Sequence, residues 1–255
     1  MDRTLRCLLA TVALALAAWP ATALELRVLS AGAVEPGMKP ALAAFERASG
    51  HVVRLAFAAA PELRSALRAA PAADVIVAPQ AALDDAGVAV DVRATVGRVG
   101  IGVAVRQTAD APEIASAESL KAALASADSV VFNRASTGTY IEAMLQRLGI
   151  AAAVEAKATR VADGASVMRR LLVGTSPREF GFAALTEIVL FRDQGIRLVG
   201  PLPAALQNTT NYVAAPWPGV DWDDPARDAV AALMRHLRSA EARAAFTGAG
   251  IELAP

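Results

Sequence analysis

Small hydroxyl residues and a glycine stand together where a predicted strand meets a predicted helix. The segment Ser136-Thr137-Gly138-Thr139 lies between the apolar run 128–132 and the helical pattern 140–149. Hydroxyl side chains at a helix start accept hydrogen bonds from the first backbone N–H groups, which explains the segment as a helix cap. The same N–H groups carry a partial positive charge and suit an anion. For this segment alone, both interpretations stay open.

Comparable segments stand at other predicted strand ends and helix starts. In an open parallel sheet, ligands bind outside the carboxyl ends of the strands. Several such segments converging on one cleft therefore favour an anion site over a set of unrelated caps. The segments are Ser30-Ala31-Gly32-Ala33, Ala58-Ala59-Ala60-Pro61, Asp163-Gly164-Ala165 and Thr186-Glu187.

Charged residues near these segments offer further chemistry. Glu187 and Asp163 could act as general bases, although carboxylates at helix starts are usually caps. Arg134 adjoins the hydroxyl segment and could pair with a carboxylate or be solvated. The two histidines, His51 and His236, have no metal-ligand spacing, so we expect neither a metal site nor a cofactor.

The first residues have the pattern of a secretory signal peptide. Arg3 and Arg6 precede an apolar run over 7–19, which is followed by the small residues 21–23. We expect residues 1–23 to be removed by cleavage after Ala23 and the protein to reside in the periplasm. The only cysteine, Cys7, lies in this segment, so the mature chain has no disulfide.

The composition excludes several kinds of partner. Lys and Arg total 25 and Asp and Glu total 25, so the chain has no basic excess for nucleic acid. Aromatic residues make up 5% of the chain, which argues against aromatic platforms that stack on bases. We expect a monomer whose partner is a small molecule.

Short apolar runs alternate with helical periods along the chain, which predicts an α/β fold with mostly parallel, mixed sheets. The strand-like segments 97–106 and 210–216 are not followed directly by helices, so they are candidates for crossing strands between two lobes. We expect lobe 1 over residues 24–100 plus 212–255, and lobe 2 over residues 101–211. The predicted strands are 26–30, 51–57, 73–79, 97–106, 128–132, 179–184, 196–200 and 210–216, and the predicted helices include 140–149, 164–174 and 186–195.

The order of these segments resembles the ModA-like periplasmic solute-binding proteins, which are the molybdate-binding members of the type 2 periplasmic binding proteins. The resemblance covers the mature chain and runs through "LRVLSAGAVEPGMKPALAAFERASG", "ADVIVAP", "GRVGIGVAVR", "VVFNRASTGTYIEAMLQRLGI" and "FGFAALTEI". It implies two lobes that close on an anion and deliver it to the membrane permease of an ABC transporter. It also implies ligand contacts at Ser30, near Ala59-Ala60, near Ser136-Thr137-Gly138 and near Gly164-Ala165.

Two departures from the molybdate binders change the expected ligand. The chain has Ala58-Ala59-Ala60-Pro61 where those proteins place a serine, and alanine near Ala183-Ala184 where they place a tyrosine. Each missing donor would leave part of a desolvated tetrahedral oxyanion without a hydrogen bond. The departures therefore suggest a larger anion, such as an organic acid.

An enzyme is the alternative to a binding protein. Aconitate isomerase is similar to the same scaffold, and an isomerase of a tricarboxylate needs a base near an acidic C–H together with donors for the carboxylates. Glu187, Asp163 and Tyr140 are candidates for the base or acid, and Arg134 and Thr186 are candidates for ligand contacts.

Overall fold

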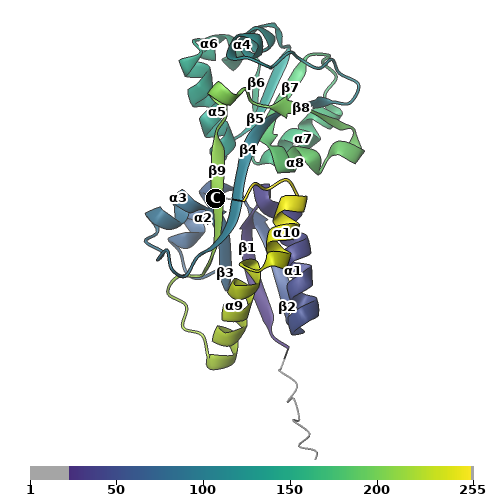
Figure 1. Ribbon diagram of the computed structural model, residues 1–255. Helices are drawn as coiled ribbons and strands as arrows, with labels where there is room; N and C mark the ends of the chain where they lie inside the picture. The colour runs from purple at the N-terminus through teal and green to yellow at the C-terminus, as the bar shows by residue number, and fades with distance from the viewer. Residues whose placement is uncertain (1–22, 254–255) are drawn as a thin grey trace, which may run out of the picture.

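The computed structural model describes residues 23–253, so the predicted signal peptide, apart from Ala23, lies outside the described residues. Two lobes are stacked end to end and are joined by two long strands, β4 (Ala94–Arg106) and β9 (Thr209–Pro216) (Figure 1). Among residues 23–253, no helix is long and apolar enough to cross a membrane. The predicted two-lobed α/β architecture is confirmed.

Lobe 1 is a mixed sheet covered by helices. Its three parallel strands are β1 (Glu25–Ala31), β2 (Val52–Ala58) and β3 (Val75–Pro79), and β9 adds an antiparallel neighbour to β3. The strands carry apolar side chains toward the helices, as the wholly buried strand β3 illustrates. The surrounding helices are η1 (Gly32–Val34), α1 (Glu35–Ser49), α2 (Ala60–Leu67), α3 (Gln80–Asp85), α9 (Asp224–Leu237) and α10 (Ala240–Gly248).

Lobe 2 repeats this arrangement around the carboxyl half of β4. Strands β5, β6 and β7 are parallel, and β7 and β8 run antiparallel to β4. The strands are β5 (Ser129–Asn133), β6 (Ala158–Val161), β7 (Glu179–Ala184) and β8 (Ile196–Pro201). The helices are α4 (Ala117–Ser126), α5 (Ser136–Arg147), α6 (Ala151–Glu155), α7 (Gly164–Val173), α8 (Leu185–Val189), η2 (Arg192–Gln194) and η3 (Ala204–Leu206).

Strand β4 changes partner where the chain passes between the lobes. It pairs with β9 as far as Gly100 and with β7 from Ile101 onward. Each lobe has apolar clusters of its own, with Trp217 and Phe45 in lobe 1 and Phe132 and Phe182 in lobe 2. We propose that the lobes divide at this point, as the sequence predicts.

Several elements differ from the sequence prediction. The helix predicted from Tyr140 begins four residues earlier, at Ser136. The helix predicted over 186–195 ends at Val189, and a 3-10 turn and Gly195, with φ of 103°, lead into β8. Helices α3 and α6 and strand β6 were not predicted, because elements of four to six residues are too short to show a periodicity.

Candidate functional site

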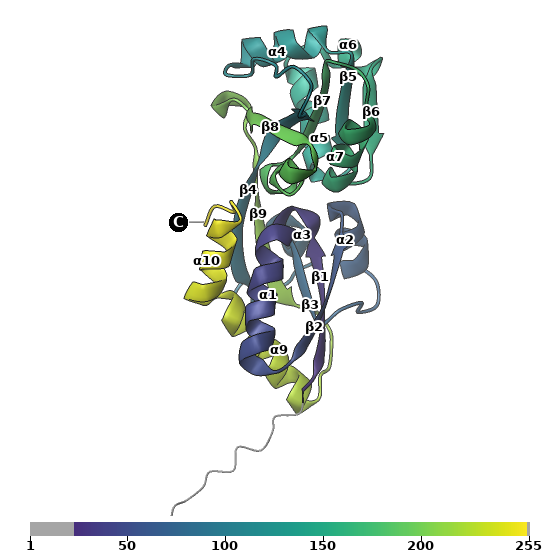
Figure 2. The same ribbon diagram turned by 90° about the vertical axis from the view of Figure 1, so that its right-hand side faces the viewer.

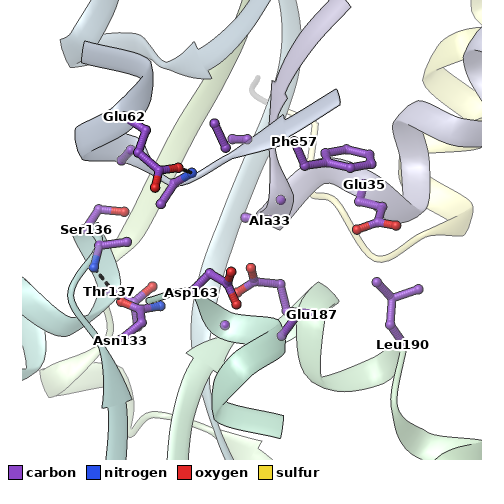
Figure 3. A pocket seen from close by; sticks show the side chains of 18 of the residues that line it. Ala33, Glu35, Phe57, Glu62, Asn133, Ser136, Thr137, Asp163, Glu187 and Leu190 are labelled. Carbon is purple, nitrogen blue, oxygen red and sulfur yellow. Dashed lines mark hydrogen bonds between the residues drawn. The ribbon is translucent and has the colours of Figure 1, made fainter. Parts of the chain in front are cut away.

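A cavity of about 450 Å³ lies between the two lobes. The ends of β1, β2 and β3 approach it from lobe 1, and the starts of α5 and α7 approach it from lobe 2 (Figure 2). Close up, Glu35 and Phe57 face the cavity from lobe 1, and Asp163 and Glu187 face it from lobe 2 (Figure 3). The cavity is therefore placed where an α/β sheet offers a ligand site, at the carboxyl ends of its strands.

The hydroxyl segment forms the first turn of α5 and lines the cavity with Ser136 and Thr137. It is therefore part of the helix and not the preceding loop. The N-cap residue, Ala135, has no side chain that can cap the helix. Asn133 Oδ1 instead accepts hydrogen bonds from the N–H groups of Ala135 and Gly138, both at 3.0 Å. The N–H groups of Ser136 and Thr137 have no helical acceptor at this position, so they are free to bind a ligand.

Gly138 does not line the cavity, although the sequence predicts that it does. Gly138 is buried beneath the first turn of α5, where its N–H donates to Asn133 Oδ1. A Cβ at this position would lie 1.5 Å from the backbone oxygen of Asn133. The glycine is thus needed so that α5 can pack tightly on the end of β5, and not so that an anion can approach.

Two further helices begin at the cavity. Gly164 and Ala165 form the start of α7, and Ala60 forms the start of α2 in the opposite lobe. Asp163 caps α7 by accepting a hydrogen bond from Ser166 N at 2.7 Å. All three predicted residues line the cavity, and Gly32, in the 3-10 turn after β1, lines it as well.

Ser30 is not part of the cavity wall. It lies within β1, paired with Phe57 and Val77, and its hydroxyl is fully buried and donates to Ala31 O at 3.2 Å. Because side chains alternate along a strand, Ser30 points into the interior of lobe 1. The strand continues to Ala31, one residue beyond the predicted end, and the wall is made by residues 31–33.

Three other candidates also lie outside the cavity. Arg134 is exposed, and its backbone N–H donates to Val161 O. The Tyr140 hydroxyl donates to Leu206 O at 2.8 Å, within lobe 2. The buried Thr186 hydroxyl donates to Ala33 O at 2.5 Å and so connects α8 of lobe 2 to lobe 1. These three side chains form hydrogen bonds elsewhere or are exposed to solvent, so we do not assign any of them a direct contact with the ligand.

Glu187 occupies the floor of the cavity, between the lobes. Its carboxylate accepts a hydrogen bond from Ala184 N at 3.2 Å. Burial raises the pKa of Glu187 to about 7; the Ala184 N–H opposes this rise, and the negative charges of Asp163 and Glu35 add to it. The carboxyl group is still accessible from the cavity. A group that titrates near neutral pH in a cleft can take up or release a proton there.

Tyr212, on the crossing strand β9, was not predicted as a site residue. It lines the cavity and is only 5% exposed. Burial raises its pKa, the charge of Glu187 adds to the rise, and the hydroxyls of Thr210 and Ser136 oppose it. The phenol is therefore a neutral hydrogen-bond donor next to the start of α5. Its only signal in the sequence is a tyrosine within the strand-like segment that joins the lobes.

The charges around the cavity are mostly engaged within their own segments. Four carboxylates line it, at Glu35, Glu62, Asp163 and Glu187. Glu62 accepts from Ala59 N at 2.9 Å, as Asp163 does from Ser166 N, and Glu35 pairs with Lys39. Among the described residues of the wall, Lys39 and Arg169 are the cations; neither was predicted, because exposed helical cations carry no distinguishing pattern. Within residues 23–253 no acidic, histidine or cysteine cluster could hold a metal ion.

Comparisons with known proteins agree with this geometry. The family model described as "Bacterial extracellular solute-binding protein" matches residues 26–252. The chain is 32% identical over 255 residues to an aconitate isomerase from a Pseudomonas species, with 94% of this chain and 91% of the relative covered. The predicted resemblance to ModA-like periplasmic binding proteins is confirmed.

Solved structures share the fold at low sequence identity. The periplasmic molybdate-binding protein of Azotobacter vinelandii matches with a TM-score of 0.69 and 15% identity, covering 90% of this chain and 100% of that one. The sulfate-binding protein of Mycobacterium tuberculosis matches with a TM-score of 0.67 and 13% identity, covering 89% of this chain and 86% of that one. The type 2 periplasmic binding protein fold follows from these similarities.

Proposed function

The chain belongs to the family of bacterial extracellular solute-binding proteins, and we propose that it captures a small organic anion in the cavity between its lobes. One observation carries the proposal: helices α2, α5 and α7 begin at the cavity from opposite lobes. The first turn of α5 directs free N–H groups toward this volume, and the starts of α2 and α7 add partial positive charge. We propose that the protein acts as a monomer in the periplasm and delivers its ligand to the permease of an ABC transporter.

An organic acid fits the wall better than a molybdate-like oxyanion. The cavity of about 450 Å³ is within the range of sites for small organic ligands. Ala58, Ala59 and Ala60 supply no side-chain donors on the lobe 1 side. Phe57 and Leu190 add apolar surface, which a carbon skeleton can contact and a tetrahedral oxyanion cannot use.

Glu187 favours a second candidate function, the isomerisation of a tricarboxylate. The Glu187 carboxyl group faces the cavity, and its pKa near 7 allows it both to take up and to release a proton at neutral pH. A carboxylate in this position can take a proton from a carbon next to a substrate carboxylate and return it to another carbon, which moves the double bond without any net redox change. Of the predicted acids and bases, the Tyr140 hydroxyl is engaged with Leu206 O, whereas Asp163 and Glu187 both face the cavity and each caps a helix. Glu187 is the one whose pKa is raised to near 7 by burial.

The similarity to an aconitate isomerase supports this second candidate. The negative charge that develops on the substrate during proton removal would be stabilised by the free N–H groups at the start of α5. Tyr212 adds a neutral donor beside the start of α5. Transport and isomerisation both require the same anion site, so the two candidates differ in turnover and not in where the ligand binds.

A thermal-shift panel of molybdate, sulfate, dicarboxylates and tricarboxylates tests the anion site. A ligand present at 100 times its Kd should stabilise the protein by about 2.7 kcal/mol, which is readily measured. Each ligand that binds is then incubated with the protein and followed by proton NMR. A receptor leaves the ligand unchanged, whereas an isomerase converts an excess of it. No shift with any anion would contradict the proposed function.

A variant separates the two candidates further. Glu187→Gln keeps the size of the side chain but cannot take up a proton. For an isomerase, the variant should lose turnover and still bind the anion. For a receptor, ligand binding should lose its pH dependence near pH 7 while no product forms with either protein. Glu113→Gln, which alters a carboxylate that accepts a hydrogen bond from Ala115 N outside the cavity, is the matched control.

A further inference from the structure

Two cations line the cavity from opposite lobes. Lys39 lies on α1 in lobe 1, and Arg169 lies on α7 in lobe 2. Their side chains are 62% and 61% exposed, so both can move without disturbing the core. We propose that Lys39 and Arg169 bind the outer carboxylates of an elongated polycarboxylate whose inner carboxylate lies at the start of α5, an inference that rests on the proposed anion site.

The contacts of Lys39 keep it at the wall without fully engaging it. Its ammonium group pairs with Glu35 one turn earlier on α1 and lies 5.8 Å from the centroid of the Phe57 ring. Exposed ion pairs of this kind contribute little to stability, so a ligand carboxylate can share or replace Glu35 as the partner. The aromatic ring lines the cavity too, so its contact with the cation keeps the ammonium group near the wall.

Arg169 also has donors to spare. Its nearest carboxylate oxygen, Asp163 Oδ1, is 3.7 Å from Nη2 and already accepts from Ser166 N at 2.7 Å. Its hydrogen bond goes to Ser166 Oγ at 2.9 Å. The next residue, Arg170, is paired at 3.0 Å with the buried Glu179 and belongs to the interior of lobe 2. Arg169 is therefore the arginine of α7 that can bind a ligand carboxylate, with the two parallel hydrogen bonds that a guanidinium offers.

The placement of the cations selects ligands by the number of carboxylates. In this arrangement an oxyanion at the start of α5 would use the helix N–H groups alone. The proposal gives a dicarboxylate one of the two cations as an additional partner, and a tricarboxylate both. Closure of the lobes would bring Lys39 and Arg169 to the same ligand, because they stand on different lobes. Affinity should therefore rise from mono- to di- to tricarboxylate.

Calorimetric titration with sulfate, acetate, succinate and propane-1,2,3-tricarboxylate tests the inference. We expect the wild-type protein to bind the tricarboxylate most tightly. Lys39→Gln and Arg169→Gln should each weaken tricarboxylate binding by about tenfold or more, since each removes a charge-assisted hydrogen bond. Arg47→Gln, on the exposed side of α1, and Lys121→Gln, on the exposed side of α4, are the matched controls and should bind as wild type.

The outcomes distinguish this inference from the proposed function. Tight binding of sulfate with no binding of the tricarboxylate would overturn the role of the two cations and leave the anion site in place. Unchanged tricarboxylate affinity in both glutamine variants would overturn it as well. If no anion binds to the wild-type protein, the proposed function fails together with the inference. Recovery of affinity in Lys39→Arg would support a direct role of the positive charge.

Discussion

The carboxyl group of Glu187 fills the space that a side chain at position 164 would need. A Cβ built on Gly164 would lie 1.9 Å from Glu187 Oε2, and a Cβ on Gly32 would lie 3.3 Å from Oε1. Gly32 belongs to lobe 1, whereas Gly164 and Glu187 belong to lobe 2. Two glycines therefore form a slot for the carboxyl group at the junction of the lobes, directly at the start of α7.

Gly164→Ala should displace this carboxyl group from its slot. The added methyl group cannot coexist with Oε2 in its present position, and such overpacking costs about 1–3 kcal/mol. We expect a lower melting temperature and a changed affinity for the anion, measured by calorimetry. Gly248→Ala is the control, because a Cβ there meets nothing within 4 Å and the position is at the end of a helix. Equal behaviour of both variants would contradict the tight fit of Glu187.

The raised pKa of Glu187 predicts how stability depends on pH. The folded protein keeps the proton up to about pH 7, whereas the unfolded chain loses it near the ordinary value of 4.5. Between these values the folded state binds more protons, so the contribution of this group to the free energy of unfolding falls as pH rises. At about 1.4 kcal/mol per pKa unit, the loss is on the order of 3 to 4 kcal/mol.

Glu187→Gln isolates this contribution. Between pH 5 and pH 8 the contribution of Glu187 should lower the free energy of unfolding of the wild-type protein. This decrease should be absent from the variant, because glutamine does not titrate. Urea unfolding at steps of one pH unit gives the free energy of unfolding of each protein. In the difference between the two proteins, the contributions of the other titrating groups cancel. Parallel curves for the two proteins would show that Glu187 ionises at its ordinary pKa.

The first turn of α5 should determine ligand affinity. Ser136→Ala and Thr137→Ala each remove a hydroxyl that lines the cavity, and we expect affinity for the bound anion to fall by about tenfold, or about 1.4 kcal/mol. Ser116→Ala provides the comparison, because Ser116 is a true N-cap that accepts from Ser119 N far from the cavity. That variant should lose about 1 kcal/mol of stability and keep its affinity. If the affinity is unchanged in both α5 variants, the two hydroxyl groups do not contact the anion and have only a structural role.

The sequence predicted which segments line the cavity better than it predicted the individual residues. Strand ends and helix starts are marked by local patterns, so Ser136, Thr137 and Gly164 were found through the strands and helices that they join. Ser30 was misplaced because the last strand residue and the first loop residue look alike, while their side chains point to opposite sides. Only the packing of lobe against lobe could reveal Tyr212 and Lys39, since neither stands at a strand end or a helix start.

Gly138 illustrates the same limit in another way. A glycine beside hydroxyl residues suggests close approach to a ligand, but the neighbour it approaches is the backbone of Asn133. Gly138→Ala should destabilise the protein more than Gly164→Ala, because a backbone oxygen at 1.5 Å cannot move aside as the end of a side chain can. Chemical denaturation of the two variants measures the order. If Gly138→Ala lowered the free energy of unfolding less than Gly164→Ala, α5 would pack on β5 less tightly than in the structure.

The hydrogen bond from Thr186 to Ala33 O predicts a further effect, on the relation between the lobes. Both groups are buried, and they join α8 to the turn after β1 in addition to the two crossing strands. Thr186→Val preserves the shape of the side chain but leaves the carbonyl oxygen without its donor, at a cost of about 1–3 kcal/mol.

We expect two measurements to change in Thr186→Val. The free energy of unfolding should fall by that amount, and small-angle scattering of the ligand-free protein should show a wider distribution of lobe separations. Thr247→Val is the control, because its hydroxyl is exposed and bonds only within α10, so its effect should stay within about 0.5 kcal/mol. Loss of stability without any change in scattering would mean that the bond supports α8 locally. A change in both, with weaker anion binding, would mean that this contact sets the starting position from which the lobes close.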